Sequence, residues 1–225
     1  MEIEISFEPR MGKASLKLSI FLIKKLGDLL MPKLLFQGHA SYRITANDGR
    51  VIFVDPFKGE GYDMPADIIL VTHQHIDHNR IKRCAQKPGC RVITHEEALE
   101  GGNHNAFDIG GIRIQAVEAA NKKHDPKQCV GYIITLDGVK LYASGDTSKT
   151  KQMETFAAIG LDYAFFPGDG LFNMGPEEAA ECARLVGAKH NILIHLKPGE
   201  SIRKKVEKWT APNKLLVEPG QEIDL

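Results

Sequence analysis

The stretch Asp67-Ile68-Ile69-Leu70-Val71-Thr72-His73-Gln74-His75-Ile76-Asp77-His78 decides the fold of this chain. Its first part is a short apolar run that follows Pro65 and is rich in β-branched residues, which is typical of a buried strand. Its second part places four side chains that can bind metal directly after that strand. Imidazoles and a carboxylate without a thiolate favour zinc, with manganese and iron as alternatives.

The spacing of these four side chains fits more than one metal position. On a turn between extended and helical geometry, His73 and His75 point one way, while Asp77 and His78 turn toward a second position. Two-metal hydrolytic sites hold their ions about 3.5–4 Å apart. The alternative is a polar loop whose histidines only cap a strand. So many ligand side chains directly after a strand favour the metal site.

The Thr-His-x-His-x-Asp-His motif resembles the signature of the metallo-β-lactamase superfamily of hydrolases. Other landmarks of that superfamily follow in the same order over about residues 33–200: Gly38-His39-Ala40-Ser41, Asp55-Pro56, His124, Ser144-Gly145-Asp146-Thr147 and Ile194-His195. The Gly-His-Ala opening and the Asn173-Met174 segment are most similar to the L-ascorbate-6-phosphate lactonase-like branch.

This resemblance implies an α/β fold, a four-layer αββα sandwich of two mixed β-sheets flanked by helices. The metal site would lie at one edge, where loops from both halves meet. The implied ligands of two divalent metal ions, with zinc first and Mn²⁺ or Fe²⁺ as alternatives, are His73, His75 and His124 for one ion, Asp77, His78 and His195 for the other, and Asp146 between them.

The implied activity is metal-dependent hydrolysis. A hydroxide bridging the two ions would attack a carbonyl centre of a lactone or ester, or a phosphoryl centre. Asp77 and His78 are the predicted catalytic residues, and Asp77 would orient the nucleophile. The alternatives are a phosphodiesterase that cleaves nucleic acid or phospholipid, and a metal-bound module that senses or binds without turnover.

Charge and composition limit the kinds of partner that we expect for this chain. Lys+Arg and Asp+Glu are both 29, so the formal charge is zero and nonspecific nucleic-acid binding is not expected. We expect a small-molecule substrate. Lys122 and Lys123 beside His124, and Lys197 after His195, suggest that it is anionic. A homo-oligomer is compatible with the sequence. Four cysteines without a Cys-x-x-Cys pair indicate a reducing, cytoplasmic environment.

Two domains are predicted, an N-terminal amphipathic helical extension over residues 1–31 and the hydrolase domain over residues 32–225. The extension would pack on the protein body or on a partner subunit. The alternative is contact with a membrane surface through residues 11–30. A third interpretation takes Met31 as the natural start, because the resemblance begins there.

Several local expectations complete the analysis. Strands form two groups, within residues 33–117 and 130–195, and a last strand covers Leu215–Val217. Short helices are expected over 80–86 and 148–156. His39 should lie near the metals without binding them, and Asp55 should orient the histidine loop. His95 is expected to be solvated.

Overall fold

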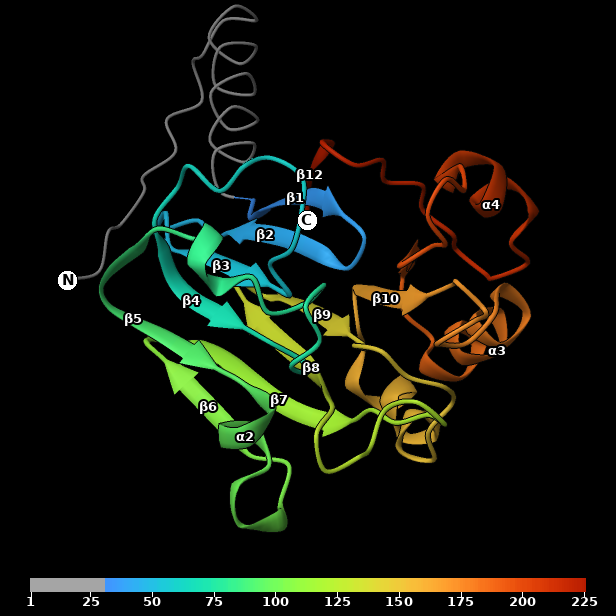
Figure 1. Cartoon of the computed structure of the whole chain (residues 1–225), viewed down its shortest axis with the longest axis horizontal. Helices are drawn as coiled ribbons and strands as arrows, with labels where there is room; N and C mark the ends of the chain where they lie inside the picture. The colour runs from blue at the N-terminus through green and yellow to red at the C-terminus, as the bar shows by residue number, and fades with distance from the viewer. Residues whose placement is uncertain (1–30) are drawn as a thin grey trace, which may run out of the picture. The chain divides into compact units, whose positions relative to one another are not determined.

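Two six-stranded β-sheets form the framework of residues 31–225, the part of the chain that this computed structural model describes. The first sheet has the strand order β12-β1-β2-β3-β4-β5 and the second the order β11-β10-β9-β8-β7-β6 (Figure 1). The strands are β1 (Lys33–Gly38), β2 (Ser41–Thr45), β3 (Val51–Val54), β4 (Ala66–Leu70), β5 (Gln86–Ile93), β6 (Ala106–Ile109), β7 (Ile112–Glu118), β8 (Val130–Leu136), β9 (Val139–Ala143), β10 (Tyr163–Pro167), β11 (His190–Ile194) and β12 (Glu222–Asp224).

Both sheets are mixed. β3, β4 and β5 pair in parallel in the first sheet, as do β9, β10 and β11 in the second, whereas the other neighbours are antiparallel. The helices are α2 (His95–Ala98), α3 (Pro176–Val186) and α4 (Ile202–Lys208), with the 3-10 helices η1 (Ile81–Arg83), η2 (Glu100–Gly102) and η3 (Gln152–Ile159). The prediction of two mixed sheets flanked by helices is therefore confirmed.

The main core lies between the two sheets. The period of two along a strand sends Ile52 of β3 into this core, where it joins residues of the second sheet, while Phe53 packs on the outer face of the first sheet. Tyr42 of β2 stacks on Phe165 of β10 across the interface, with ring centroids 4.5 Å apart. Strands that are apolar on both faces must be covered on both sides, which requires layers outside the sheets.

Within the described residues, the outer faces of the two sheets are covered by different kinds of element. On the second sheet, η3, α3 and α4 supply an apolar cluster that includes Phe156, Val186, Val206 and Trp209. On the first sheet, the outer cluster around Phe53 is joined by side chains from the loop after β3 and from η1. No helix within residues 31–225 is long and apolar enough to cross a membrane.

Several strand and helix predictions are corrected. β6 and β7 belong to the second sheet, and the last strand is β12 rather than 215–217, so the predicted grouping of the strands is wrong at its borders. The expected helix over 80–86 is only η1, because β5 already begins at Gln86. Pro88 is tolerated in β5 because this strand lies at the edge of the sheet. The helix expected over 148–156 is η3, which starts later.

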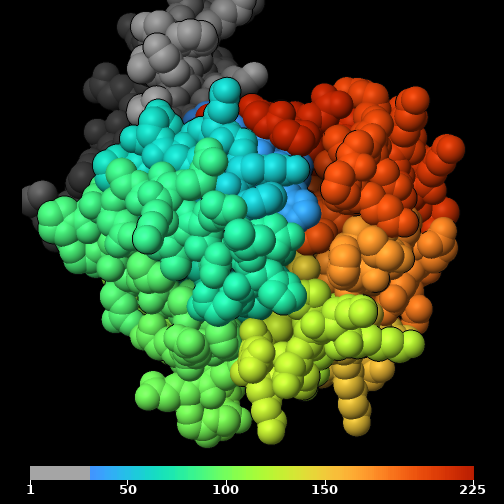
Figure 2. Space-filling model, viewed as in Figure 1, coloured from blue at the N-terminus to red at the C-terminus, as the bar shows by residue number. Residues whose placement is uncertain are grey.

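The predicted N-terminal extension over residues 1–31 falls outside the described residues, apart from Met31, and remains a prediction. Residues Pro32–Leu225 form one compact unit. In the space-filling view, segments of both sheets reach the same face of this unit (Figure 2).

Candidate metal centre

The candidate metal centre lies where strand ends of both sheets meet. His73–His78 follows the carboxyl end of β4 in the first sheet, while Asp146 and His195 follow the carboxyl ends of β9 and β11 in the second. His124 comes from the loop that precedes β8. The two halves are joined directly at this edge, because the Val130 N–H donates to the Thr72 carbonyl at 3.0 Å. Residues more than a hundred positions apart thus reach one place.

The structure brings all seven predicted ligands together. They fall into overlapping sets whose potential ligand atoms lie within 4.8 Å of one another: His73, His75 and His124; His73, His78 and Asp146; and His39, Asp77, His78 and His195. The first and third sets match the two groups that the sequence assigned to two ions, with His39 in addition.

Asp146 lies between these sets. Its Oδ2 is 3.4 Å from His124 Nε2 and 3.3 Å from His195 Nε2, and its Oδ1 is 3.4 Å from His78 Nε2. The backbone approach depends on Gly145, where a Cβ would stand 2.7 Å from the Val130 carbonyl oxygen. The carboxylate therefore faces imidazoles of both groups at once.

The donor atoms of this cluster fit divalent metal ions. His73 Nε2, His78 Nε2 and Asp146 Oδ1 are buried without a hydrogen-bond partner in residues 31–225. Such orphaned polar atoms are costly unless a ligand satisfies them. Burial lowers the pKa of His73 to about 2, so this imidazole is neutral, the form that binds metal. A set of imidazoles and carboxylates is the donor chemistry of zinc and of manganese or iron.

Asp146 carries negative charge at the middle of the cluster. Burial opposes its ionisation, but the neighbouring His78 and His195 hold the pKa of this carboxyl well below its usual range. Burial likewise opposes protonation of His195, yet Asp146 and Asp169 raise its pKa to about 10. His195 would therefore give up a proton to a bound cation, and that cation would meet the negative charge of the carboxylates.

Asp55 holds the histidine loop in place, as the sequence predicted. Its Oδ1 accepts the Thr72 N–H at 2.8 Å, and its Oδ2 accepts the Thr72 hydroxyl at 2.8 Å and lies 2.8 Å from His78 Nδ1. The Thr72 hydroxyl also lies 3.0 Å from His73 Nδ1. One buried carboxylate therefore fixes the rings of two candidate ligands, with their Nε2 atoms left free for metal.

Asp169 is a site residue that the sequence reasoning missed. Its Oδ2 lies 3.1 Å from His195 Nδ1, on the side of the ring away from Asp146. Its Oδ1 accepts the backbone N–H groups of Leu171 and Phe172 at 2.6 and 2.7 Å, which close the loop after β10. The carboxylate forms a close ion pair with the His195 ring, whereas Asp55 forms a hydrogen bond with the His78 ring.

Two asparagines extend these contacts to the third histidine. Asn121 Oδ1 lies 3.0 Å from His124 Nδ1, and Asn121 Nδ2 donates to Asn173 Oδ1 at 3.0 Å. Asn173 Nδ2 in turn donates to Asp146 Oδ2 at 3.0 Å. His124 and Asp146 are therefore connected by a chain of hydrogen bonds as well as by proximity.

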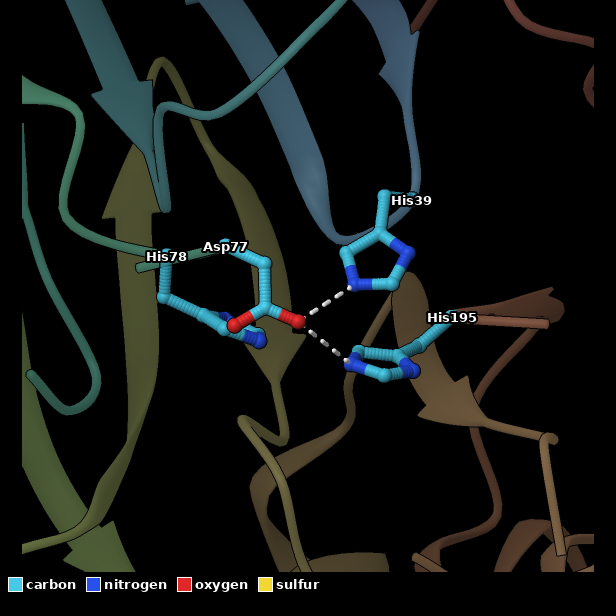
Figure 3. Close-up of side chains that lie close together, drawn as sticks. All are labelled: His39, Asp77, His78 and His195. Atoms are coloured by element: carbon cyan, nitrogen blue, oxygen red, sulfur yellow. Dashed lines mark hydrogen bonds and ion pairs between the residues drawn. The ribbon is translucent and has the colours of Figure 1, made fainter. Parts of the chain in front are cut away.

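His39 lies beside the candidate ligands, as the sequence analysis expected, and contacts one of them directly. Figure 3 shows its ring and that of His195 both directed at Asp77. His39 Nε2 lies 3.0 Å from Asp77 Oδ2, whereas His195 Nε2 is 3.8 Å from the same oxygen. The backbone at His39, Asp55 and His195 has positive φ angles of 60°, 45° and 48°, an uncommon conformation for residues other than glycine.

The prediction that His95 is solvated is wrong. Its side chain is buried and lines a cavity of about 300 Å³ with His73, His75 and His124. It lies in the first turn of α2, and this helix packs against β5. Of the predicted lysines, Lys123 lines this cavity, and Lys197 borders a separate groove beside Asp77.

Comparison with known proteins agrees with this fold. A sequence profile described as "Beta-lactamase superfamily domain" matches residues 33–195. The chain therefore belongs to this superfamily, as its resemblance to the metallo-β-lactamases predicted. This match covers every predicted ligand from His73 to His195.

Within that superfamily, similar relatives are called UPF0173 metal-dependent hydrolases. One from Myxococcus xanthus is 32% identical over 70% of this chain and 68% of its own length. One from Thermococcus onnurineus is 28% identical over 87% of this chain and 100% of its own length. A solved structure from Parabacteroides distasonis, also assigned as a metal-dependent hydrolase, has a TM-score of 0.71 at 28% identity and covers 82% of this chain and 91% of that one.

Proposed function

We propose that this chain is a binuclear metal-dependent hydrolase, with zinc as its first metal, that opens a lactone or ester bond in a small anionic substrate. The observation that carries the proposal is the position of Asp146 between two groups of imidazoles, each group with orphaned nitrogen atoms. The relatives named as metal-dependent hydrolases support the reaction class.

Each group of residues has a separate task in this proposal. His73, His75 and His124 would hold one ion, Asp77, His78 and His195 the other, and Asp146 both. Bound metal ions would lower the pKa of coordinated water toward 7 and polarise the electrophilic oxygen. The protein fixes the ligand rings through Asp55 and Asp169, so that little reorganisation is needed when substrate binds.

Asp77 differs from the other carboxylates in its access to substrate. Its side chain is 31% exposed, whereas that of Asp146 is 4% exposed. Asp77 lines both a cavity over the cluster and the neighbouring groove. A carboxylate in this position can orient the attacking water and accept its proton, which is the role proposed for Asp77 with His78 beside it.

Carbonyl chemistry is preferred to phosphodiester cleavage on the resemblance to the lactonase-like branch, which rests on the Gly38–Ser41 opening and on Asn173. In the structure Asn173 donates to both Asp146 and Asp169, so this branch feature belongs to the site itself. The four cysteines are free thiols, which supports a cytoplasmic location.

The test combines metal content with activity. Elemental analysis of metal-replete protein should give two equivalents of metal per chain, and His124→Ala should lose about one of them. His104→Ala, in a loop outside the clusters, is the matched control. Activity is then measured on a panel of lactones and on bis(p-nitrophenyl) phosphate. Faster cleavage of the phosphodiester would favour the alternative, and no turnover of either would favour a binding or sensing module.

A further inference from the structure

A groove of about 780 Å³ extends from the Asp77 side of the candidate metal centre. Three segments supply most of its lining: the end of β1 with the turn around His39, the loop 57–59 after β3, and residues 195–202 from the end of β11 to the start of α4. In Figure 2, atoms from the start of the described chain (blue) lie recessed between the cyan segment that follows them and the red segment near the C-terminus. The groove therefore opens to solvent on this face.

Two other cavities touch the same centre and are smaller. One of about 300 Å³ lies beside His73 and His75 and is lined mainly by polar residues, and one of about 220 Å³ lies over Asp146 and His195. Small-molecule sites in proteins are about 300–1,000 Å³. The 780 Å³ groove has room for a substrate longer than the reacting group, and His39, Asp77 and His195 form its inner end.

One part of the groove wall is apolar. Phe57, Leu196 and Ile202 line it as half-buried side chains, and the buried Phe36 lies among them. Leu196 and Ile202 also pack against the core, so this wall is held in place before substrate binds. Half-buried apolar side chains that border a cavity favour a ligand with an apolar chain.

The open side of the groove carries positive charge. Lys58 and Lys197 are exposed lining residues, and neither forms an ion pair with a carboxylate within residues 31–225. The Lys58 ammonium lies 5.9 Å from the centre of the Phe57 ring. Glu200, the acidic residue at this rim, is already paired with Lys205 at 2.8 Å. Lys58 and Lys197 therefore supply positive charge at the rim of the groove.

We propose that this groove is the substrate-binding site, and that its substrate is amphiphilic. An apolar chain would lie along Phe57, Leu196 and Ile202. An anionic carboxylate or phosphate group would lie between Lys58 and Lys197, and the bond to be cleaved at the His39–Asp77–His195 end. This inference rests on the proposed hydrolase function and adds to it the substrate class and the residues that select it.

The first experiment measures hydrolysis by metal-replete, full-length protein. Three p-nitrophenyl esters are compared: the anionic, long-chain suberate monoester, the anionic, short-chain succinate monoester, and the uncharged octanoate ester. The suberate monoester should have the highest kcat/KM. Lys58→Ala and Lys197→Ala should each lower its kcat/KM about two- to fivefold, mainly through KM, and leave the uncharged ester unchanged. Lys151→Ala, at an exposed lysine that lines none of these cavities, is the control.

The second experiment measures binding without turnover. Calorimetric titration with octanoate should give a Kd at least tenfold lower than acetate or octanol, because only octanoate offers both a chain and a charge. Acetate controls for direct coordination of a carboxylate to metal. The Kd for octanoate should rise about two- to fivefold in each lysine variant. Pro198→Trp, at an exposed lining position, should weaken octanoate binding by filling the groove while acetate binding persists.

The outcomes separate the two proposals. Lysine-dependent octanoate binding without hydrolysis of any ester or phosphodiester would keep the groove and overturn the hydrolase. Hydrolysis that is unchanged in Lys58→Ala, Lys197→Ala and Pro198→Trp would keep the hydrolase and overturn the groove. Lys123→Ala is measured beside these variants, and a loss confined to it would place the substrate in the 300 Å³ cavity and overturn this inference.

Discussion

His39 Nε2 lies 3.0 Å from Asp77 Oδ2, and the His39 carbonyl oxygen accepts the backbone N–H of His195 at 2.9 Å. A single residue in the β1–β2 turn therefore contacts two candidate ligands, one through its ring and one through its backbone. The contact joins the first sheet to the second at the inner end of the groove. His39 is thus suited to position Asp77 relative to His195.

This relationship predicts the effect of removing the ring. His39→Ala should lower kcat at least tenfold with a much smaller change in KM, because partners that orient ligands cost about 10–100-fold in affinity or activity when lost. His39→Gln should recover part of the rate, since its amide can donate to Asp77. Equal losses in both variants, in step with a lower Tm, would indicate a structural role only.

Asp77→Asn should abolish turnover while leaving the fold intact. The substitution removes the negative charge from a proposed ligand that is also the most solvent-accessible carboxylate of the cluster. We expect at least a 100-fold loss of kcat/KM, since even residues that only orient ligands cost 10–100-fold. Circular dichroism and metal analysis complete the measurement. Activity near that of the wild type in metal-loaded D77N would rule out the role of Asp77.

Asp169→Asn should weaken metal binding without removing a ligand. His195 would lose the carboxylate that fixes its ring, while its Nε2 would remain available. The expected result is a Kd for the more weakly held metal that rises about 10–100-fold, measured by competition with a chelator. Asp125→Asn, a loop carboxylate outside the ligand sets, is the matched control. An unchanged Kd in D169N would show that His195 is oriented by other contacts.

Asp162 lies just before β10, at the other end of the strands from the candidate metal centre, and it predicts how stability depends on pH. Its carboxylate accepts the Lys140 N–H at 2.9 Å and pairs with Lys189 at 2.8 Å. Burial opposes its ionisation, but these partners lower the pKa of Asp162 below its usual value. A lowered folded-state pKa stabilises the fold above the unfolded pKa, near 3.9, and this stabilisation is lost as pH falls through the folded pKa.

Asp162→Asn should therefore lower the free energy of unfolding by about 1 kcal/mol at pH 7, which corresponds to about 2–4 °C in Tm for a chain of this size. The difference from the wild type should stay constant down to pH 4 and shrink below it. Catalytic activity should be unaffected. A difference that grows as the pH falls below 4 would have the opposite sign and would contradict the assignment.

The clustering of the candidate ligands was predictable because the motif concentrates four of them. Four side chains in His73–His78 follow one buried strand, and the remaining candidates each follow a strand end or match the superfamily landmarks. The alternation of apolar residues also predicted most strands, including the β8–β9 hairpin at its observed bounds. Periodicity captures which faces are buried, but it does not state which strands become neighbours. The position of β6, β7 and β12 was therefore missed.

Asp169 and His95 are two residues whose positions beside the site the sequence analysis did not predict. Asp169 stands in a Pro-Gly-Asp-Gly loop, where an aspartate is usually part of a turn, and it does form one. Only the tertiary fold brings its second oxygen to His195. The same signal that marked Asp55 and Asp146, an aspartate just after a buried strand, could have found it. His95 was judged from its helix turn alone, whereas its burial depends on the sheet beneath.

The positive φ angles at the centre have a consequence for evolution and engineering. Five residues other than glycine adopt such angles within residues 31–225, and three of them, His39, Asp55 and His195, form the centre. Each such conformation costs roughly 1 kcal/mol or more. A glycine at His39 or His195 would relieve that strain but would remove a candidate ligand or its partner, and a glycine at Asp55 would also leave the Thr72 N–H and the His78 ring without their carboxylate. Substitutions chosen only to relax the backbone would therefore dismantle the centre, and engineering for thermostability should leave these three positions alone.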